Sequence, residues 1–226
     1  MIPIRDTIPA QRTAWIVRLL LVANLGVFAF EIRQGPALET FLYRCGLVPA
    51  AWVITSARDL LQWPGLMATL VLSQFLHGGL LHVGANMLYL WIFGDNVEDR
   101  LGHGRFLLLY LGSGVIAGLT ECVIQPQSSV PMIGASGAIA GVLGAYFLLF
   151  PFAKVVTLIP LLFVWQCVEL PAFLFLGFWF VLQWLQGLTT IGRMTQVGGV
   201  AWWAHVGGFA CGLGLILLLR PRRHYF

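Results

Sequence analysis

Apolar residues along the chain gather into long runs, separated by shorter stretches rich in proline, glycine and charged residues. A helix needs about 20 mostly apolar residues to cross a hydrocarbon layer of about 30 Å. Six runs are close to this length, so the pattern predicts six membrane-spanning helices. Their expected positions are 14–32, 80–97, 105–124, 135–151, 169–187 and 199–219.

The composition points to the same class of protein. Hydrophobic residues make up 59% of the 226 residues and charged residues only 10%, which is more apolar than a soluble core could hide. We therefore expect an all-α polytopic membrane protein, in which residues 1–226 form one domain built as a six-helix bundle. The first span follows a charged stretch and has no small-residue cleavage site behind it, so we interpret it as a retained helix.

The distribution of Lys and Arg orients the chain, because basic residues accumulate in short cytoplasmic loops. Nine basic residues fall on one side of the six spans and four on the other, which places both termini in the cytoplasm. Residues 1–13 and 220–226 are then cytoplasmic tails, and residues 33–79 are a long outer loop. The nine are Arg5, Arg12, Arg18, Arg100, Arg105, Lys154, Arg220, Arg222 and Arg223, and the four are Arg33, Arg44, Arg58 and Arg193.

These features define the expected surroundings of the protein. We expect an integral membrane protein of a bacterial inner membrane, in contact with the lipid bilayer. Because no basic patch is interleaved with aromatic residues, we expect no nucleic-acid partner.

Two connecting segments are unusually apolar. The outer loop 33–79 carries Trp52 and Trp63, and amphipathic aromatics of this kind favour the membrane interface. The segment 152–168 is interrupted by Lys154 and Pro160. A seventh span there would place the basic C-terminal residues outside, so we interpret this segment as an interfacial connection.

Charged residues and cysteines elsewhere need no special chemistry. The stretch 94–105, with clustered charges and three glycines, predicts a solvated cytoplasmic turn in which His103 has no catalytic role. Glu169 precedes Pro171 at the expected start of the fifth span, an ordinary helix-start pattern.

The cysteines show no metal-ligand spacing. Cys167 and Cys211 lie in apolar stretches and are expected to be buried thiols. Cys45 and Cys122 both fall near the outer face, and a disulfide between them is an open alternative.

Candidate chemistry begins at Ser136, where a polar loop broken by prolines gives way to an apolar helix. The first N–H groups of a helix lack intrahelical partners, which suits an oxyanion that forms beside the hydroxyl. Glycines 134, 137, 141 and 144 give the helix a bare face. A serine in such a stripe can equally be a packing device between membrane helices.

A second glycine-lined helix carries His205, which is followed by Gly207 and Gly208. If the two bare faces meet, imidazole and hydroxyl come within the roughly 2.6–3.2 Å that proton transfer requires. The carboxylates Glu121 and Glu169 lie near helix ends and are not obvious partners for this histidine. The pattern therefore predicts a Ser136–His205 dyad without an orienting acid.

The second span and the segment leading into it contain polar residues that are costly in lipid, namely His77, His82 and Asn86. The four-residue step from His82 to Asn86 puts both on one helical face. Hydrogen bonding between helices is one explanation. A zinc site is the sharper alternative, but the five-residue step from His77 to His82 is off one face, and no carboxylate or thiol joins them. We therefore expect no metal.

Three motifs together resemble a known family. His77-x4-His82-x3-Asn86, Gly134-x-Ser136-Gly137 and Ala204-His205-x-Gly207-Gly208 occur in the order and on the spans found in rhomboid intramembrane serine proteases. The Asn96-Val-Glu-Asp-Arg-Leu-Gly102 turn is also similar, and the resemblance runs from about residue 15 to residue 220.

The resemblance implies that Ser136 is the nucleophile and His205 the general base. It further implies that His82 and Asn86 stabilise the oxyanion and that His77 has a supporting role. The implied activity is hydrolysis of peptide bonds in or near the transmembrane helices of membrane-protein substrates, without a cofactor.

Two departures from the family pattern stand out. Ala68-Thr69 replaces a Trp-Arg pair that some members carry in the outer loop, and Ala140 replaces a tyrosine one turn after the serine. The packing beneath His205 is therefore left open. A non-proteolytic rhomboid-like binder of membrane helices is the alternative function, although such relatives should lack the serine or the histidine. A channel or transporter would favour paired charges at mid-membrane, which the sequence does not show.

Overall fold

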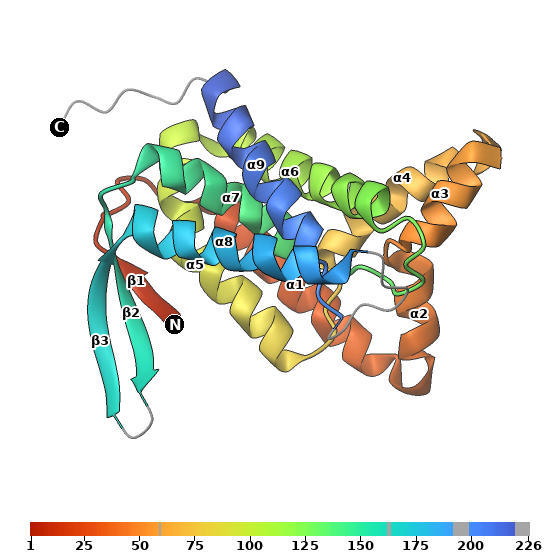
Figure 1. Cartoon of the computed structure of the whole chain (residues 1–226), viewed down its shortest axis with the longest axis horizontal. Coiled ribbons are helices and arrows are strands. Elements are labelled where there is room, and N and C mark those ends of the chain that lie inside the picture. The colour runs from red at the N-terminus through yellow and green to blue at the C-terminus, as the bar shows by residue number, and fades with distance from the viewer. Residues whose placement is uncertain (59, 162–163, 192–198, 220–226) are drawn as a thin grey trace.

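The computed structural model of the chain describes residues 1–58, 60–161, 164–191 and 199–219, so the expected basic tail 220–226 and Arg193 lie outside the described residues. The described part is a helical bundle with a small antiparallel sheet at one end (Figure 1). All six predicted long helices are present, which makes this a mostly helical, polytopic membrane protein. They are α1 (Trp15–Arg33), α5 (Leu80–Leu101), α6 (His103–Ile124), α7 (Ser136–Leu149), α8 (Ala172–Thr190) and α9 (Trp202–Leu218).

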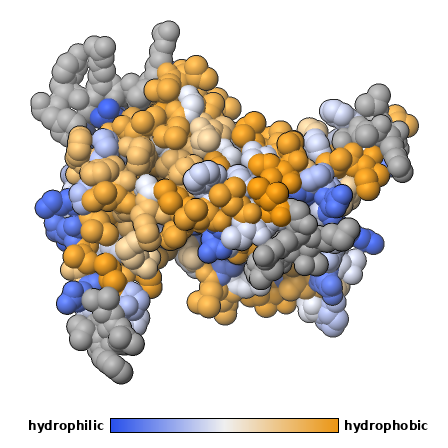
Figure 2. All heavy atoms as spheres, in the orientation of Figure 1, coloured by the Kyte–Doolittle hydropathy of each residue, from blue (hydrophilic) through white to orange (hydrophobic). Residues whose placement is uncertain are grey.

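The helices differ in how they fit a membrane. Among the described residues, α1, α6 and α8 are each long and apolar enough to cross alone. A fourth crossing arises if α5 is joined to the segment Trp63–Phe75, from which it is bent by 85°. The helices α7 and α9 are shorter apolar helices. Figure 2 shows hydrophobic residues over most of the middle of the bundle, as lipid contact requires.

The short helix α7 lies at the centre of the bundle. Every residue from Gly137 to Tyr146 is buried, and α7 packs against α5, α6 and α9. A helix that is apolar on all sides is expected in such a position. The serine at its start is therefore held by the best-packed element of the fold.

Glycines allow α7 and α9 to touch backbone to backbone. A Cβ atom at Gly212 would lie 1.9 Å from the carbonyl oxygen of Gly141, and one at Gly208 would lie 2.1 Å from that of Gly137. The contacts occur in the same order along both helices, so the two helices run parallel and begin at the same end. This confirms the predicted meeting of the two bare faces.

The segment 33–79, expected to be an outer loop, is largely helical in its described part and lies at the end of the bundle away from the sheet (Figure 1). It is fastened to the loop before α7, because the backbones of Leu47 and Met132 exchange hydrogen bonds of 3.1 and 2.7 Å. Its elements are the 3-10 turn Gly35–Ala37, α2 (Leu38–Cys45), α3 (Pro49–Arg58), the 3-10 turn Leu60–Gln62, α4 (Trp63–Leu72) and the 3-10 turn Ser73–Phe75.

The cysteines are all free in the described part of the chain, so the open alternative of a Cys45–Cys122 disulfide is not formed. The expectation of buried thiols at the other two positions was wrong. Cys167 is exposed because it lies on a strand outside the bundle, and Cys211 is half-buried.

The sheet was not predicted. Its strands are β1 (Ile2–Asp6), β2 (Lys154–Leu161) and β3 (Val164–Pro171), antiparallel and in the order β1-β2-β3. It therefore replaces both the expected N-terminal tail and the expected interfacial connection. Two runs of β-branched and apolar residues that lie close together in the sequence favour a hairpin.

Glu169 lies in β3 opposite Val156, not at a helix start. Its carboxylate accepts a hydrogen bond of 2.9 Å from Nζ of Lys154. The hydrogen bond and the positive charge of Lys154 lower the pKa of Glu169 below its ordinary value. The helix α8 begins later, at Ala172, directly after Pro171.

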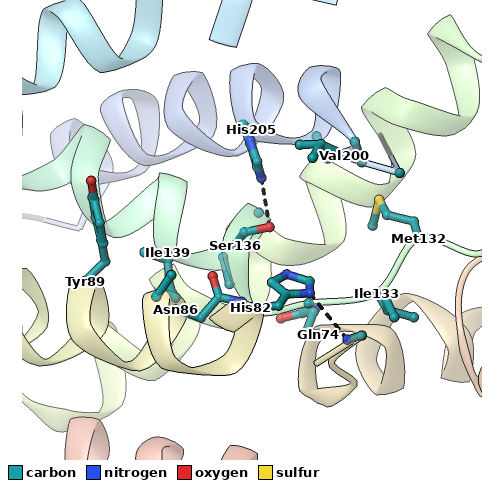
Figure 3. Close-up of a pocket in the computed structure, with 18 of the residues that line it drawn as sticks. Gln74, His82, Asn86, Tyr89, Met132, Ile133, Ser136, Ile139, Val200 and His205 are labelled. Atoms are coloured by element: carbon teal, nitrogen blue, oxygen red, sulfur yellow. Dashed lines mark hydrogen bonds between the residues drawn. The ribbon is translucent and has the colours of Figure 1, made fainter. Parts of the chain in front are cut away.

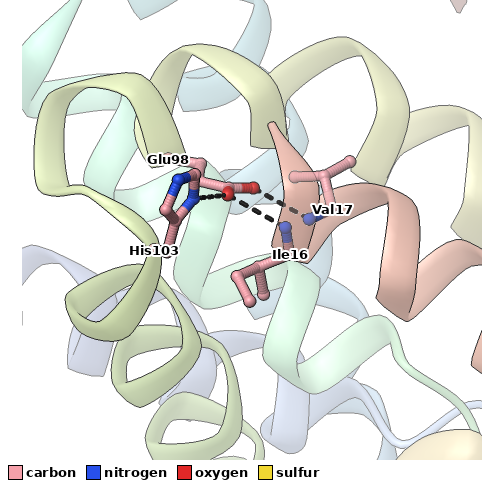
Figure 4. A network of polar contacts seen from close by, with 4 residues as sticks. All are labelled: Ile16, Val17, Glu98 and His103. Carbon is pink, nitrogen blue, oxygen red and sulfur yellow. Dashed lines mark hydrogen bonds and ion pairs between the residues drawn. The ribbon is translucent and has the colours of Figure 1, made fainter. Parts of the chain in front are cut away.

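The expected solvated turn at 94–105 is also different in the structure. Glu98 is only 1% exposed, and its carboxylate accepts hydrogen bonds from the backbone N–H groups of Ile16 (2.9 Å) and Val17 (2.8 Å) and contacts His103 (Figure 4). The first N–H groups of α1 have no partners within the helix, so a carboxylate there satisfies them. Glu98 and Asp99 are buried because the N-terminal segment packs on them, whereas His103 and Arg105 remain exposed as expected.

The strand β1 is tied to the same region. Oδ2 of Asp6 accepts hydrogen bonds from Nδ2 of Asn96 (2.7 Å) and from the hydroxyl of Tyr146, and the N–H of Gln11 donates to Asp99 (3.0 Å). Burial raises the pKa of Asp6 above its ordinary value, although these hydrogen bonds act in the opposite direction. Asp6 therefore links the sheet to α5 and to α7.

Candidate active site

Ser136 is the first residue of α7, and the loop before it is shaped by Gly134. Gly134 has φ of +122°, which residues with a side chain rarely adopt, and its N–H donates a 2.8 Å hydrogen bond to the carbonyl of Ser73. A Cβ atom at Gly134 would lie 2.7 Å from Nε2 of His82. Glycine is thus required both for the backbone conformation and for the approach of the His82 ring.

The structure brings Ser136 and His205 together. Oγ of Ser136 lies 2.8 Å from Nε2 of His205, a hydrogen-bond distance (Figure 3). The parallel packing of α7 and α9 produces this contact, because both residues lie in the first turns of their helices. His205 is 9% exposed, so the pair is shielded from solvent except through the cavity that it lines.

The other side of the His205 ring has partners that the sequence did not predict. Nδ1 of His205 lies 2.7 Å from Oε1 of Gln183, and the indole ring of Trp179 lies against the imidazole with centroids 5.8 Å apart. Both partners come from α8. Ala140 replaces a tyrosine and left open what packs against His205. In the structure these two residues of α8 pack against it. The one signal in the sequence was a polar glutamine within an apolar span.

Glu121 was also missed. Its carboxylate is 1% exposed and accepts a hydrogen bond from the N–H of Ala204. It therefore satisfies one of the free N–H groups at the start of the helix that carries His205.

His82 and Asn86 lie on α5, on the side of Ser136 opposite to His205 (Figure 3). Nδ1 of His82 accepts a 3.4 Å hydrogen bond from the N–H of Gly78, so the proton of the neutral ring is on Nε2, next to Gly134. Nδ2 of Asn86 is buried and has no hydrogen-bond partner among the described residues. The side chains of His82 and Asn86 thus bring two N–H donors to the cavity that Ser136 lines.

His77 does not line this space. Its N–H donates to both carboxylate oxygens of Glu31 (3.0 and 3.2 Å), and its ring contacts that of His82 in an edge-to-face arrangement with centroids 5.2 Å apart. Within the described ranges no group of three or more His, Cys, Asp or Glu residues could hold a metal ion. The zinc alternative would need such a group.

A cavity of about 1020 Å³ collects the candidate residues. Ser136, His205, His82, Asn86 and Gln183 all line it, together with apolar residues of α5, α7 and α8. The arrangement presents a hydroxyl hydrogen-bonded to an imidazole, and two N–H donors on the other side of that hydroxyl. This is the geometry of acyl transfer by a serine.

Comparisons with known proteins point to one family. A family model described as the Rhomboid domain matches residues 64–222. RHOMBOID-like protein 5 of Arabidopsis thaliana is 31% identical over 245 residues, which cover 98% of this chain and 73% of the relative. The chain therefore belongs to the rhomboid family.

Other relatives are matched over smaller parts of their length. Rhomboid protein 1, mitochondrial, of Saccharomyces cerevisiae is 30% identical over 202 residues, covering 88% of this chain and 51% of the relative. Rhomboid protease GluP of Bacillus subtilis is 43% identical over 84 residues, covering 37% of this chain and 15% of the relative. Relatives of plant, mitochondrial and bacterial origin agree with an integral membrane protein but do not support the expected bacterial inner membrane.

Proposed function

We propose that this protein is an intramembrane serine endopeptidase. The observation that carries the proposal is the 2.8 Å contact between Oγ of Ser136 and Nε2 of His205, in a cavity that His82 and Asn86 also line. Membership of a family that includes a rhomboid protease supports it.

The proposed reaction has two halves. Oγ of Ser136 attacks the carbonyl carbon of the scissile peptide, and its proton passes to Nε2 of His205. Nε2–H of His82 and Nδ2–H of Asn86 donate to the oxyanion. The C–N bond then breaks as His205 returns the proton to the leaving amine. Water, activated by the same histidine, hydrolyses the acyl ester and restores Ser136.

The proposed substrates are membrane proteins, cleaved in or near their transmembrane helices. The apolar surface of the bundle supports a position of the cavity among lipid chains, where a substrate helix would meet it. The backbone of a helix is closed by its own hydrogen bonds, so a substrate must unwind before attack. Helix-breaking or small residues near the scissile bond lower the free energy of unwinding. A glycine in the helix lowers it by about 1 kcal/mol relative to an alanine.

We also propose that both termini and the sheet lie in the cytoplasm and that the cavity opens at the outer side. The basic residues Arg5, Arg100, Arg105 and Lys154 all lie at the sheet end of the bundle, which supports this orientation. Reporter fusions after Phe226 and within the loop at Ser129 should report opposite sides of the membrane. Reporters on the same side would rule the arrangement out.

The test of the proteolytic function uses the full chain in detergent micelles. A serine-directed fluorophosphonate should label wild type, and a panel of transmembrane substrates should reveal cleavage. Both signals should vanish in Ser136→Ala and in His205→Ala while the protein stays folded. Ser113→Ala is the matched control, because Ser113 is buried in the middle of α6 and faces Gly141 of α7, outside the proposed machinery.

Two outcomes would contradict the proposal. Labelling that survives in Ser136→Ala would exclude Ser136 as the nucleophile. Substrate retention without cleavage by folded wild type would instead support a non-proteolytic binder of membrane helices.

A further inference from the structure

The Nδ1 atom of His205 has a hydrogen-bond partner on α8, Gln183. It lies 2.7 Å from Oε1 of Gln183, and the glutamine side chain is itself buried at 8% exposure. A buried hydrogen bond of this length fixes the direction in which both groups point, because leaving either unpaired in a low-dielectric site is costly.

The chemistry of the glutamine oxygen decides where the imidazole proton resides. An amide oxygen can only accept, so Nδ1 of His205 must carry the proton of the neutral ring. Nε2 then has a free lone pair, directed at Oγ of Ser136. This is the tautomer that a general base needs, and the opposite tautomer would donate to the serine and could not take its proton.

We propose that Gln183 is a positioning residue for His205, which holds the tautomer and the ring orientation required for proton transfer from Ser136. The inference rests on the proposed proteolytic function. It assigns to a neutral amide on α8 the task that a carboxylate performs in other serine hydrolases, and the sequence contains no acid at the site for that task.

The surroundings support this assignment. Trp179, one turn before Gln183 on α8, packs against the imidazole at a tilt of 37°, so α8 supplies both an aromatic and the hydrogen-bonding partner of the ring. The outer end of α8 is itself anchored, because Nε2 of Gln125 donates to the carbonyl and the hydroxyl oxygen of Thr190 (2.9 and 3.0 Å). Gln183 is therefore presented from a fixed helix.

Among the described residues, the titratable groups around His205 are His82 on α5, which acts on it electrostatically, and Glu121 on α6, which accepts from the preceding backbone N–H. Ser136, Gln183 and the rings of Trp179 and Trp202 also contact His205. Substitutions of Gln183 leave His82 and Glu121 in place, so a change in the pH profile reports the altered partner of Nδ1.

The experiment measures the rate of fluorophosphonate labelling, and kcat and KM for a fluorescent transmembrane peptide, from pH 5 to pH 9. In Gln183→Leu, labelling and kcat should fall by about 10- to 100-fold, since general-base catalysis is impaired, and KM should stay within about two-fold. In Gln183→Glu, the carboxylate accepts the same hydrogen bond. Activity at alkaline pH should therefore be rescued, while the acid limb of kcat/KM moves to higher pH because a carboxylate favours the imidazolium.

Gln186→Leu is the matched control, since Gln186 lies on the same helix with an exposed side chain, and it should behave as wild type. Wild-type labelling in Gln183→Leu would overturn the inference. Loss of activity in both Gln183 variants with an unmoved acid limb would also overturn it, because that result means a purely structural role. By contrast, labelling that persists in Ser136→Ala would defeat the proteolytic proposal itself.

Discussion

The backbone N–H of Ala204 donates a 2.9 Å hydrogen bond to Oε2 of Glu121, and Ala204 immediately precedes His205. A carboxylate at the start of α9 satisfies an N–H group that has no intrahelical partner and interacts favourably with the positive end of the helix dipole. The helix α6 therefore determines where the helix that carries the candidate base begins.

We predict that Glu121→Ala lowers both stability and labelling of Ser136. Loss of a helix cap typically costs about 0.5–2 kcal/mol, and a displaced α9 start moves His205 away from the serine. Glu121→Gln retains an oxygen acceptor and should lose less of both. Thermal unfolding in detergent and fluorophosphonate labelling measure the two effects.

A surface carboxylate provides the comparison. Glu169→Ala removes a pair with Lys154 that is exposed, and such pairs contribute little. If Glu121→Ala were no more harmful than Glu169→Ala, the capping role would be wrong.

We predict that His82→Ala and Asn86→Ala slow turnover without abolishing it. Each removes one donor to the oxyanion, and loss of one such donor typically costs about 10²–10³ in rate. The effect should appear in kcat more than in KM, because the interaction forms only in the transition state.

His77→Ala, in the same assay, tests whether His77 acts only by holding the His82 ring. The residue contacts the His82 ring but does not line the cavity, so its loss should resemble a mild form of the His82 variant. Wild-type kcat in folded His82→Ala and Asn86→Ala would refute the oxyanion assignment.

The sequence located Ser136 and His205 because two glycine-lined helices and a loop-to-helix transition are local patterns, and parallel packing then brings them together. It could not locate Gln183 as a partner, since the rotation of α8 about its axis decides which of its side chains faces the imidazole. The burial of Glu98 was also hidden, because it depends on the path of the N-terminal segment across the turn. The sheet was missed because β2 and β3 are apolar at successive positions, as a membrane connection would be.

We predict that Gly212→Ala is strongly destabilising and that Gly214→Ala is not. A methyl group at Gly212 would meet the carbonyl oxygen of Gly141 at 1.9 Å, so α9 must move away from α7. Overpacking of this kind typically costs about 1–3 kcal/mol. A Cβ atom at Gly214 would have no packing neighbour within 4 Å among the described residues, although both glycines are on the same helix.

The measurements are thermal unfolding and the rate of fluorophosphonate labelling. Gly212→Ala should reduce labelling as well as stability, because the separation of α7 from α9 lengthens the Ser136–His205 contact. Equal behaviour of the two alanine variants would show that the backbone contact does not determine the site.

Asp6 is expected to make the stability of the folded protein depend on pH. Burial raises its pKa in the folded state above the unfolded value, which is about 3.9. Its contribution to stability is therefore fully present below about pH 4 and is lost as the pH rises through the folded pKa, because the carboxylate must then be buried as an anion.

In Asp6→Asn, the amide oxygen can still accept from Tyr146 and Asn96, but no charge is buried. The difference in unfolding temperature between wild type and Asp6→Asn should thus shift in favour of the variant from pH 4 to pH 8. The charge repulsion between Asp6 and Asp95, which the variant removes, acts in the same direction. Asp6→Ala, which loses both hydrogen bonds, should be less stable at either pH, and a wild type that gains stability relative to Asp6→Asn at pH 8 would reverse the assigned sign.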